Sequence, residues 1–425
     1  MSHSCVFTIV AKNYIGIALL LQKSFFAHNS NSDFFIVVAD EVDDSLIVPH
    51  NIVIAKDILS INVNLWTEMS FKYNLTEFCT AIKPLSFKYF FSMGYNKVVY
   101  LDPDIYVFNS LMPIIDDLDK YNVILTPHVS GLHIDYSGEH KETTILWEGP
   151  YNLGFCALSK SSKVFMMLDW WAKRLEDLCF AYKGYPLCYD QKWMSLLPCY
   201  FSKEEILISR NLGYNIAPWN YFEREIFKEN NEYKVRFRDH SLENVVYPVA
   251  FVHFAGYKYS ELVSGKVQRA RLNVAEYDDI NALLGCYIQA FKDNSKEIEY
   301  FLRLPYSYGT YEDGTTIEKI HRSIYNGLRK EGYIVGNPFS YGKGTLLDAL
   351  TKAHVMTGSV IEKYNMETYG HIKTKEKYLN LYYRFLKRIL GFKTYLLFQK
   401  SLYLYVNPER QYILVSKYFK KKNDD

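Results

Sequence analysis

Residues 97–104 read KVVYLDPD, in which the apolar run VVYL is followed by two aspartates separated by one proline. An uninterrupted apolar run of this length predicts a strand whose two faces are both buried in a parallel sheet. Ligands of such sheets bind at the carboxyl ends of the strands. We therefore expect Asp102 and Asp104 to face a cleft, with Pro103 stiffening the turn between them because its ring fixes φ.

Similar apolar runs lie on both sides of this segment and alternate with stretches of helical spacing. The predicted strands are residues 5–11, 34–39, 52–55, 123–126, 151–158 and 249–253. The clearest predicted helices are residues 15–27, 71–79, 85–93 and 160–178. This alternation predicts an α/β domain with a mixed, mostly parallel sheet flanked by helices.

The pattern changes beyond the α/β half. Residues 274–302 have helical spacing, and residues 309–344 hold seven of the 21 glycines, which indicates loops or a hinge. We expect three parts: an α/β domain over 1–265, a helical and loop-rich extension over 266–370, and a basic amphipathic segment over 371–425.

The charge of the chain is concentrated at its C-terminal end. The net charge is +2, but residues 371–425 carry 13 Lys and Arg against four Asp and Glu. The remaining chain is therefore acidic, which argues against nucleic acid as a partner. The segment also has an apolar helical face, formed by Leu379, Tyr382, Tyr383, Leu386, Ile389 and Leu390. It is suited to an anionic membrane surface or to packing on the body of the protein.

The cysteines and the N-terminal residues indicate a compartment. The seven cysteines include no C-x-x-C pair, which favours reduced thiols over a disulfide framework. The first residues lack the pattern of a signal peptide, and no apolar run reaches the length of a spanning helix. We expect a cytoplasmic protein, peripheral on the inner membrane if the basic segment binds it.

The two aspartates are candidate ligands of a divalent cation. Paired carboxylates suit Mg²⁺ or Mn²⁺ better than zinc. A turn with two solvated aspartates is the alternative, and the apolar strand before them favours the metal. His253 ends another predicted strand and could be a third ligand, although buried histidines without a metal are more frequent.

Three further motifs carry polar groups that suit a sugar or a phosphate. Gly256 would let the backbone approach a phosphate, and Lys258 would pair with its charge. Asn152 enters a predicted strand and could bind sugar hydroxyls, unless it belongs to an ordinary turn. Asp190 and Gln191 could bind the sugar, although Asp190 is equally suited to capping a helix.

The order of these motifs resembles that of GT-A-fold glycosyltransferases, especially family 8 and related bacterial enzymes of surface-polysaccharide synthesis. The similar stretches are residues 8–14, 98–104, 151–155, 190–191 and 253–258, within about the first 260 residues. The resemblance implies transfer of a hexose-type sugar from a nucleotide diphosphate sugar, with UDP expected. The acceptor would be a glycan or a lipid-linked molecule, and anomeric configuration would be retained.

The resemblance also implies a role for each matched residue. Asp102, Asp104 and His253 would hold Mn²⁺ or Mg²⁺ against the donor diphosphate. The donor would otherwise contact Thr8, Ala11, Asn13, Tyr14, Lys83, Gly256 and Lys258. The transferred sugar would face Asn152, Asp190 and Gln191.

Two features of the sequence depart from the family, and two functions remain as alternatives to a glycosyltransferase. Family 8 enzymes usually carry an acidic residue where Ala11 or Lys12 stands, and their histidine-to-lysine spacing is one residue longer than that from His253 to Lys258. A sugar-phosphate nucleotidyltransferase is the first alternative, although its usual Gly-rich loop is replaced here by residues 11–14. A GT-A-like protein that binds sugars without turnover is the second.

Overall fold

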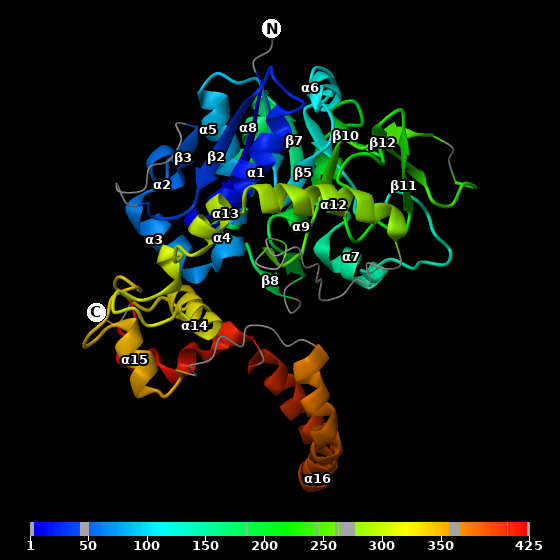
Figure 1. Ribbon diagram of the computed structural model, residues 1–425. Coiled ribbons are helices and arrows are strands. Elements are labelled where there is room, and N and C mark those ends of the chain that lie inside the picture. The colour runs from blue at the N-terminus through cyan, green and yellow to red at the C-terminus, as the bar shows by residue number, and fades with distance from the viewer. Residues whose placement is uncertain are drawn as a thin grey trace. The chain divides into compact units, whose positions relative to one another are not determined.

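The computed structural model describes residues 4–42, 51–182, 186–242, 245–259, 262, 277–356, 366–405 and 407–422. The chain divides into two compact units (Figure 1). The first comprises residues 1–61 and 75–307, and the second comprises residues 62–74 and 308–425.

The first unit is built on a seven-stranded sheet. Its strands, in spatial order, are β10 (Ile206–Ile208), β6 (Val123–Leu125), β7 (Phe155–Ser159), β4 (Lys97–Leu101), β1 (Ser4–Val10), β2 (Asp33–Val38) and β3 (Ile52–Ile54). Neighbouring strands are parallel except at β7, which is antiparallel to both β4 and β6. The predicted mixed, mostly parallel sheet is confirmed.

Helices cover both faces of this sheet, which is why its strands are apolar without alternation. Every residue of β1 and of β4 is buried. Val6 and Val10 belong to the same core cluster as the apolar side of α1 (Ile15–Phe26). On the opposite face, Phe7 contacts Phe87 of α5 (Lys83–Ser92) at a ring-centroid distance of 4.9 Å. The helix α8 (Ser162–Leu175) packs on α5.

Further elements complete the first unit. The helices are α2 (Ala55–Ile58), α4 (Leu75–Ala81), α6 (Met112–Asp117), α7 (Glu142–Glu148), α9 (Gln191–Met194), α10 (Leu197–Tyr200), α12 (Asp278–Asp293) and α13 (Ser295–Leu302). The strands β5 (Ile105–Val107) and β14 (Phe251–His253) form an antiparallel pair, as do β8 (Ala181–Tyr182) and β9 (Leu187–Cys188).

A three-stranded antiparallel sheet was not predicted. It consists of β11 (Arg224–Glu229), β12 (Glu232–Phe237) and β13 (Tyr247–Pro248). Asn230 and Asn231 connect the first two strands with φ angles of 50° and 66°. Two consecutive residues with positive φ are typical of a tight hairpin turn, and asparagine tolerates this conformation. The asparagine pair was therefore the available sequence signal.

Several predicted boundaries differ from the structure. The predicted helix over 71–79 is wrong, because α3 (Val63–Lys72) ends before Tyr73 and α4 begins at Leu75. Arg322 explains the break, since its guanidinium donates hydrogen bonds to the carbonyl oxygens of Phe71 and Tyr73 at 2.5 and 2.8 Å. The helical stretch over 274–302 is divided at Asn294, and residues 274–276 lie outside the described part.

The first unit also extends beyond the expected boundary at residue 265. The reason is close packing of α13 on α1, where a Cβ atom on Gly16 would lie 2.7 Å from the Cα atom of Ile298. Ser307 likewise belongs to this unit, because its backbone N–H donates to Asp40 at 3.0 Å. Residues 277–307 therefore complete the α/β unit.

The second unit is mainly helical. It contains α3, α14 (Lys319–Lys330), α15 (Leu346–Lys352), α16 (Met366–Tyr405) and the 3-10 turns η4 (Pro408–Leu414) and η5 (Ser416–Tyr418). Phe71, Ile324, Leu350 and Val415 are fully buried in its core. Gly391, with φ of 70°, interrupts α16. Among the described helices, none combines the length and apolarity needed to cross a membrane.

Candidate metal and donor site

The acidic turn follows β4, as expected, and a second strand brings His253 to it. The chain turns from Asp102 to Asp104 and enters β5, which pairs with β14 so that His253 lies opposite Ile105. The Nε2 atom of His253 lies 3.0 Å from Oδ1 of Asp104 and 3.7 Å from Oδ2 of Asp102. Two backbone hydrogen bonds hold the turn, one from Asp102 to Gly154 at 2.8 Å and one from Phe254 to Asp104 at 2.9 Å.

These three side chains fit a divalent cation. One ligand atom from each of them can be chosen so that all three lie within 4.8 Å of one another. Ligands of Mg²⁺ in an octahedron lie about 2.1 Å from the ion and therefore about 3–4 Å apart. Burial raises the pKa of Asp102, and the charges of Lys83 and His253 offset only part of that effect. A cation at this position would favour the ionised carboxylate, and Mn²⁺ or Mg²⁺ suits this set of oxygen and nitrogen donors.

Asn215, to which the sequence assigned no role, orients the histidine. Its Oδ1 atom lies 3.3 Å from Nδ1 of His253, and its Nδ2 group donates to Thr126 Oγ1 at 2.9 Å and to Asn152 Oδ1 at 3.1 Å. The side-chain carbonyl of Asn215 can therefore accept a hydrogen bond from the Nδ1–H group of His253. The Nε2 lone pair then points at the carboxylates, as a metal ligand requires. Asn215 is buried and has φ of 53°, a conformation that asparagine tolerates.

Replacing Asn215 with alanine is expected to weaken Mn²⁺ binding about ten- to a hundred-fold, because the imidazole loses the partner that fixes its tautomer and orientation. Asn215→Asp should retain more of the affinity, since a carboxylate still accepts from Nδ1. Calorimetric titration of Mn²⁺ in the presence of a nucleoside diphosphate would measure both. Equal Mn²⁺ affinity in the wild-type protein and Asn215→Ala would contradict the assignment.

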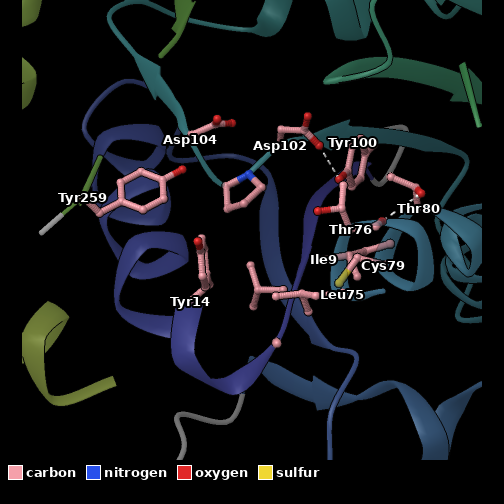
Figure 2. A pocket seen from close by; sticks show the side chains of 13 residues that line it. Ile9, Tyr14, Leu75, Thr76, Cys79, Thr80, Tyr100, Asp102, Asp104 and Tyr259 are labelled. Carbon is pink, nitrogen blue, oxygen red and sulfur yellow. Dashed lines mark hydrogen bonds between the residues drawn. The ribbon is translucent and has the colours of Figure 1, made fainter. Parts of the chain in front are cut away.

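A cavity of about 280 Å³ lies beside the acidic turn (Figure 2). Residues 9–11 and Tyr14 contribute to its lining from the end of β1, together with Tyr259, whose ring centroid lies 5.4 Å from that of Tyr14. Figure 2 shows Thr76, Cys79 and Thr80 of α4 on the other side. Asp102 and Asp104 line the cavity as well, so it opens onto the candidate metal site.

The cavity includes some of the predicted donor residues and omits others. Ala11 and Tyr14 line it, whereas Thr8 is buried within β1 and Asn13 is not among the lining residues. The α4 residues and Tyr259 were missed, because their positions depend on how distant segments pack. Gly256, with φ of 80°, makes the turn after β14, and the side chain of Lys258 is exposed.

Lys83 and Asp190 form a buried ion pair. The Nζ atom of Lys83 lies 2.6 Å from Oδ2 of Asp190, donates to the carbonyl oxygen of Leu153 at 2.9 Å and lies 4.1 Å from the centroid of the Tyr100 ring. Burial lowers the pKa of Lys83, but the carboxylates of Asp190 and Asp102 outweigh burial and the net shift is upward. Lys83 therefore stays charged and holds Asp190 in place. Asp190 precedes α9 without making a side-chain capping bond.

A cation–π contact and a hydrogen bond, both made by Tyr100, connect this ion pair with the acidic turn. The hydroxyl group of Tyr100 donates to Oδ1 of Asp102 at 2.5 Å, and its ring faces Lys83. Asn152 accepts from the backbone of Gly154 at 3.0 Å, and Gln191 lies 3.5 Å from the backbone nitrogen of Leu153. The predicted sugar-binding residues are thus brought together through residues 152–154.

Comparison with known proteins found solved structures that are similar to this chain. No protein-family model and no curated protein sequence matches the chain. The galactosyltransferase LgtC, solved with donor and acceptor sugar analogues, is 20% identical over 59% of this chain and 87% of its own, with a TM-score of 0.35. The bifunctional glycosyltransferase WbbM is 14% identical over 71% of this chain and 52% of its own, with a TM-score of 0.37. Mouse xyloside xylosyltransferase 1 is 10% identical over 51% of this chain and 87% of its own, with a TM-score of 0.32.

Proposed function

We propose that the chain is a metal-dependent glycosyltransferase that uses a nucleotide diphosphate sugar. The observation that carries the proposal is the convergence of Asp102, Asp104 and His253, with ligand atoms within 4.8 Å, beside the cavity of Tyr14 and Tyr259. A base stacked on the ring of Tyr14 would place its diphosphate at the acidic turn. The metal-centred arrangement also fits the resemblance found in the sequence.

The reaction exchanges one bond of the anomeric carbon for another. The bond from this carbon to the diphosphate oxygen breaks, and its electron pair leaves with the diphosphate. The oxygen of an acceptor hydroxyl bonds to the carbon and loses its proton to the leaving diphosphate. When bound, a divalent cation would neutralise charge that develops on the diphosphate. Asn152 and Gln191 would bind the sugar hydroxyls near this centre.

Asp190 contributes by position and not as a nucleophile. Retaining glycosidases use a free carboxylate that attacks the anomeric carbon. The carboxylate of Asp190 is buried against the ammonium group of Lys83 at 2.6 Å, which reduces its nucleophilicity. Departure of the diphosphate and attack by the acceptor on the same face of the sugar would retain configuration without such a nucleophile. We propose this course, with UDP as the carrier and a hexose as the sugar.

The experiment that tests the proposal is donor hydrolysis without an acceptor. The full-length protein would be incubated with Mn²⁺ and a panel of UDP-, GDP-, ADP- and dTDP-sugars, and free sugar would be quantified by chromatography. Metal-dependent cleavage of one donor is expected. If no donor is cleaved, donor binding would be measured by calorimetry, and no binding of any donor would refute the proposal. Release of pyrophosphate from a nucleoside triphosphate and a sugar phosphate would identify a nucleotidyltransferase instead.

The helix α16 supports a second part of the proposal, association with an anionic membrane surface. Its apolar side chains include Leu379, Tyr382, Phe385, Ile389 and Phe392, all at least 47% exposed. Lys377, Arg384, Lys387 and Arg388 are exposed on the same helix. Within the described residues this apolar surface is not packed into a core. Basic amphipathic helices of this kind bind the interface of anionic membranes.

Reversing three of these charges, with Arg384→Glu, Lys387→Glu and Arg388→Glu, is expected to weaken vesicle binding by more than about a hundred-fold, at about 1 kcal/mol for each basic residue near the surface. Sedimentation with phosphatidylcholine vesicles, with and without phosphatidylglycerol, would measure it. The matched control reverses Lys141, Lys203 and Lys296, which are exposed on the first unit. An equal loss of vesicle binding in both variants, or binding that does not depend on phosphatidylglycerol, would contradict a role for α16.

A further inference from the structure

A second cavity, of about 460 Å³, lies between the segment of residues 129–136 and α7. Val129, Leu132, Ile134, Tyr136, Ile145 and Leu146 give it an apolar lining. Leu132, Ile134 and Leu146 are 94%, 101% and 74% exposed. Single exposed apolar side chains are ordinary on protein surfaces, whereas several around one cavity indicate a binding surface. We call this cavity the apolar cleft.

The segment that presents Leu132 and Ile134 is held by specific contacts. The buried carboxylate of Glu223 accepts hydrogen bonds from the backbone nitrogens of Ser130 and Gly131 at 3.0 Å and lies 3.1 Å from Nε2 of His133. The ring of Phe222 packs on His133 and Tyr136 at centroid distances of 4.9 and 4.8 Å. These contacts hold the backbone on both sides of the two exposed apolar side chains.

α7 links the apolar cleft to the candidate sugar site of Asn152, Asp190 and Gln191. Ile145 and Leu146 line the cleft, and Glu148 follows within one turn, a rise of about 5 Å from Ile145. The carbonyl oxygen of Glu148 accepts a hydrogen bond from Nε2 of Gln191 at 3.3 Å, and Lys192 donates to the carbonyl oxygen of Leu146. On the other wall, the segment of residues 129–136 follows Thr126, whose hydroxyl accepts a hydrogen bond from Asn215, and Asn215 also donates to Asn152.

The chemistry of the lining restricts what the apolar cleft could bind. No lysine or arginine is among the described residues that line it, and Glu142 is its one carboxylate. His133 also lines the cleft, but its Nε2 atom lies 3.1 Å from the carboxylate of Glu223. A phosphate or another anion would therefore lack a cationic partner there, whereas burying hydrocarbon against leucine and isoleucine is favourable. A ligand that spans both regions would need a polar end at Gln191 and an apolar end in the cleft.

We propose that the apolar cleft binds the hydrocarbon chain of an amphiphilic acceptor, a sugar joined to a lipid, and so directs its glycan end toward Asn152 and Gln191. This inference rests on the proposed glycosyltransferase function and specifies its acceptor class. The covalent step is unchanged: the acceptor hydroxyl takes the sugar, and the diphosphate leaves with the electron pair. The cleft contributes binding only.

The test compares n-octyl and methyl glycosides of glucose and galactose as acceptors for the full-length protein with its identified donor and Mn²⁺, below the concentrations at which octyl glycosides form micelles. The wild-type protein is expected to show a KM for the octyl compound at least about ten-fold below that for the methyl compound. The double variant Leu132→Asn, Ile134→Asn should lose this difference and keep the wild-type rate of donor hydrolysis. Because both side chains are exposed, these changes should leave the fold intact.

Met166→Asn is the matched control, because Met166 is an apolar residue of α8 that is 72% exposed away from the cleft. Equal KM values for octyl and methyl acceptors, a preserved preference in the double variant, or an equal loss in Met166→Asn would overturn the proposal. A dimer that the double variant dissociates would also overturn it, by assigning the cleft to a second copy of the chain.

Failure of the glycosyltransferase function can be distinguished from failure of this inference. If no donor is turned over, calorimetric titration of octyl and methyl glycosides into the wild-type protein and the double variant still measures the affinity of the cleft for the octyl chain. Tighter octyl binding that the double variant loses would support it, and equal binding of both glycosides would overturn it.

Discussion

Replacing Asp104 with asparagine is expected to lower metal-dependent donor hydrolysis by about a thousand-fold, since a bound cation contributes several kcal/mol to the charged transition state. Asparagine preserves the size of the side chain and removes its charge. Asp104 lies 3.0 Å from Nε2 of His253, and its backbone carbonyl, which accepts from Phe254 at 2.9 Å, is unaffected by the change. The fold should therefore be retained.

Asp104 is a better choice than Asp102 for this test. Asp102 also accepts from the hydroxyl group of Tyr100 at 2.5 Å and lies near the buried charge of Lys83, so its replacement would disturb several contacts at once. Rates would be measured by chromatography over a Mn²⁺ titration, and thermal unfolding would verify the fold. Asp135→Asn, at an exposed aspartate, is the control. Activity within about ten-fold of wild type at every Mn²⁺ concentration would exclude Asp104 as a ligand.

The part of the site that follows from the sequence is the part set by local structure. β4 is buried on both faces, so its residues form a continuous apolar run, and the aspartates that follow had to lie at the edge of the sheet. His253 could be predicted as a third candidate ligand for the same reason, since it ends the buried strand β14. Its distance from Asp104 depends on the pairing of β5 with β14, which no local pattern encodes.

The parts that could not be predicted depend on contacts between distant segments. No helix continues through Tyr73, because the guanidinium group of Arg322 donates hydrogen bonds to the carbonyl oxygens of Phe71 and Tyr73. Asn215 acquires its function only through His253 and Asn152, which are far from it in sequence. α4 and Tyr259 likewise reach the cavity by packing, since neither carries a motif of its own.

Gly154→Ala is expected to disrupt the candidate metal site by a steric clash with His253. A Cβ atom on Gly154 would lie 2.4 Å from Cε1 and 2.6 Å from Nδ1 of His253, and 2.8 Å from Oδ1 of Asn152. A backbone shift at Gly154 would break two hydrogen bonds. Its carbonyl oxygen accepts from the backbone N–H of Asp102 at 2.8 Å, and its own N–H donates to Oδ1 of Asn152 at 3.0 Å. The imidazole must move instead, and it separates from Asn215.

The expected result is Mn²⁺ affinity lowered about a hundred-fold and a fold destabilised by about 1–3 kcal/mol through overpacking. Calorimetry and chemical denaturation would measure the two effects. Gly285→Ala is the matched control: no atom lies within 4 Å of its new Cβ, so it should stabilise α12 by about 1 kcal/mol or leave it unchanged. Wild-type Mn²⁺ affinity in Gly154→Ala would contradict the arrangement.

A double variant separates the steric effect from the loss of the ligand. His253→Ala removes the ring that the new methyl group meets, so combining it with Gly154→Ala should cost less stability than the two single changes together. Metal binding should remain absent, because the imidazole is gone. Stability that is simply additive would show that Gly154→Ala acts through another contact, such as Asn152. Stability recovered without metal affinity would establish that Gly154 is required because His253 lies directly against it.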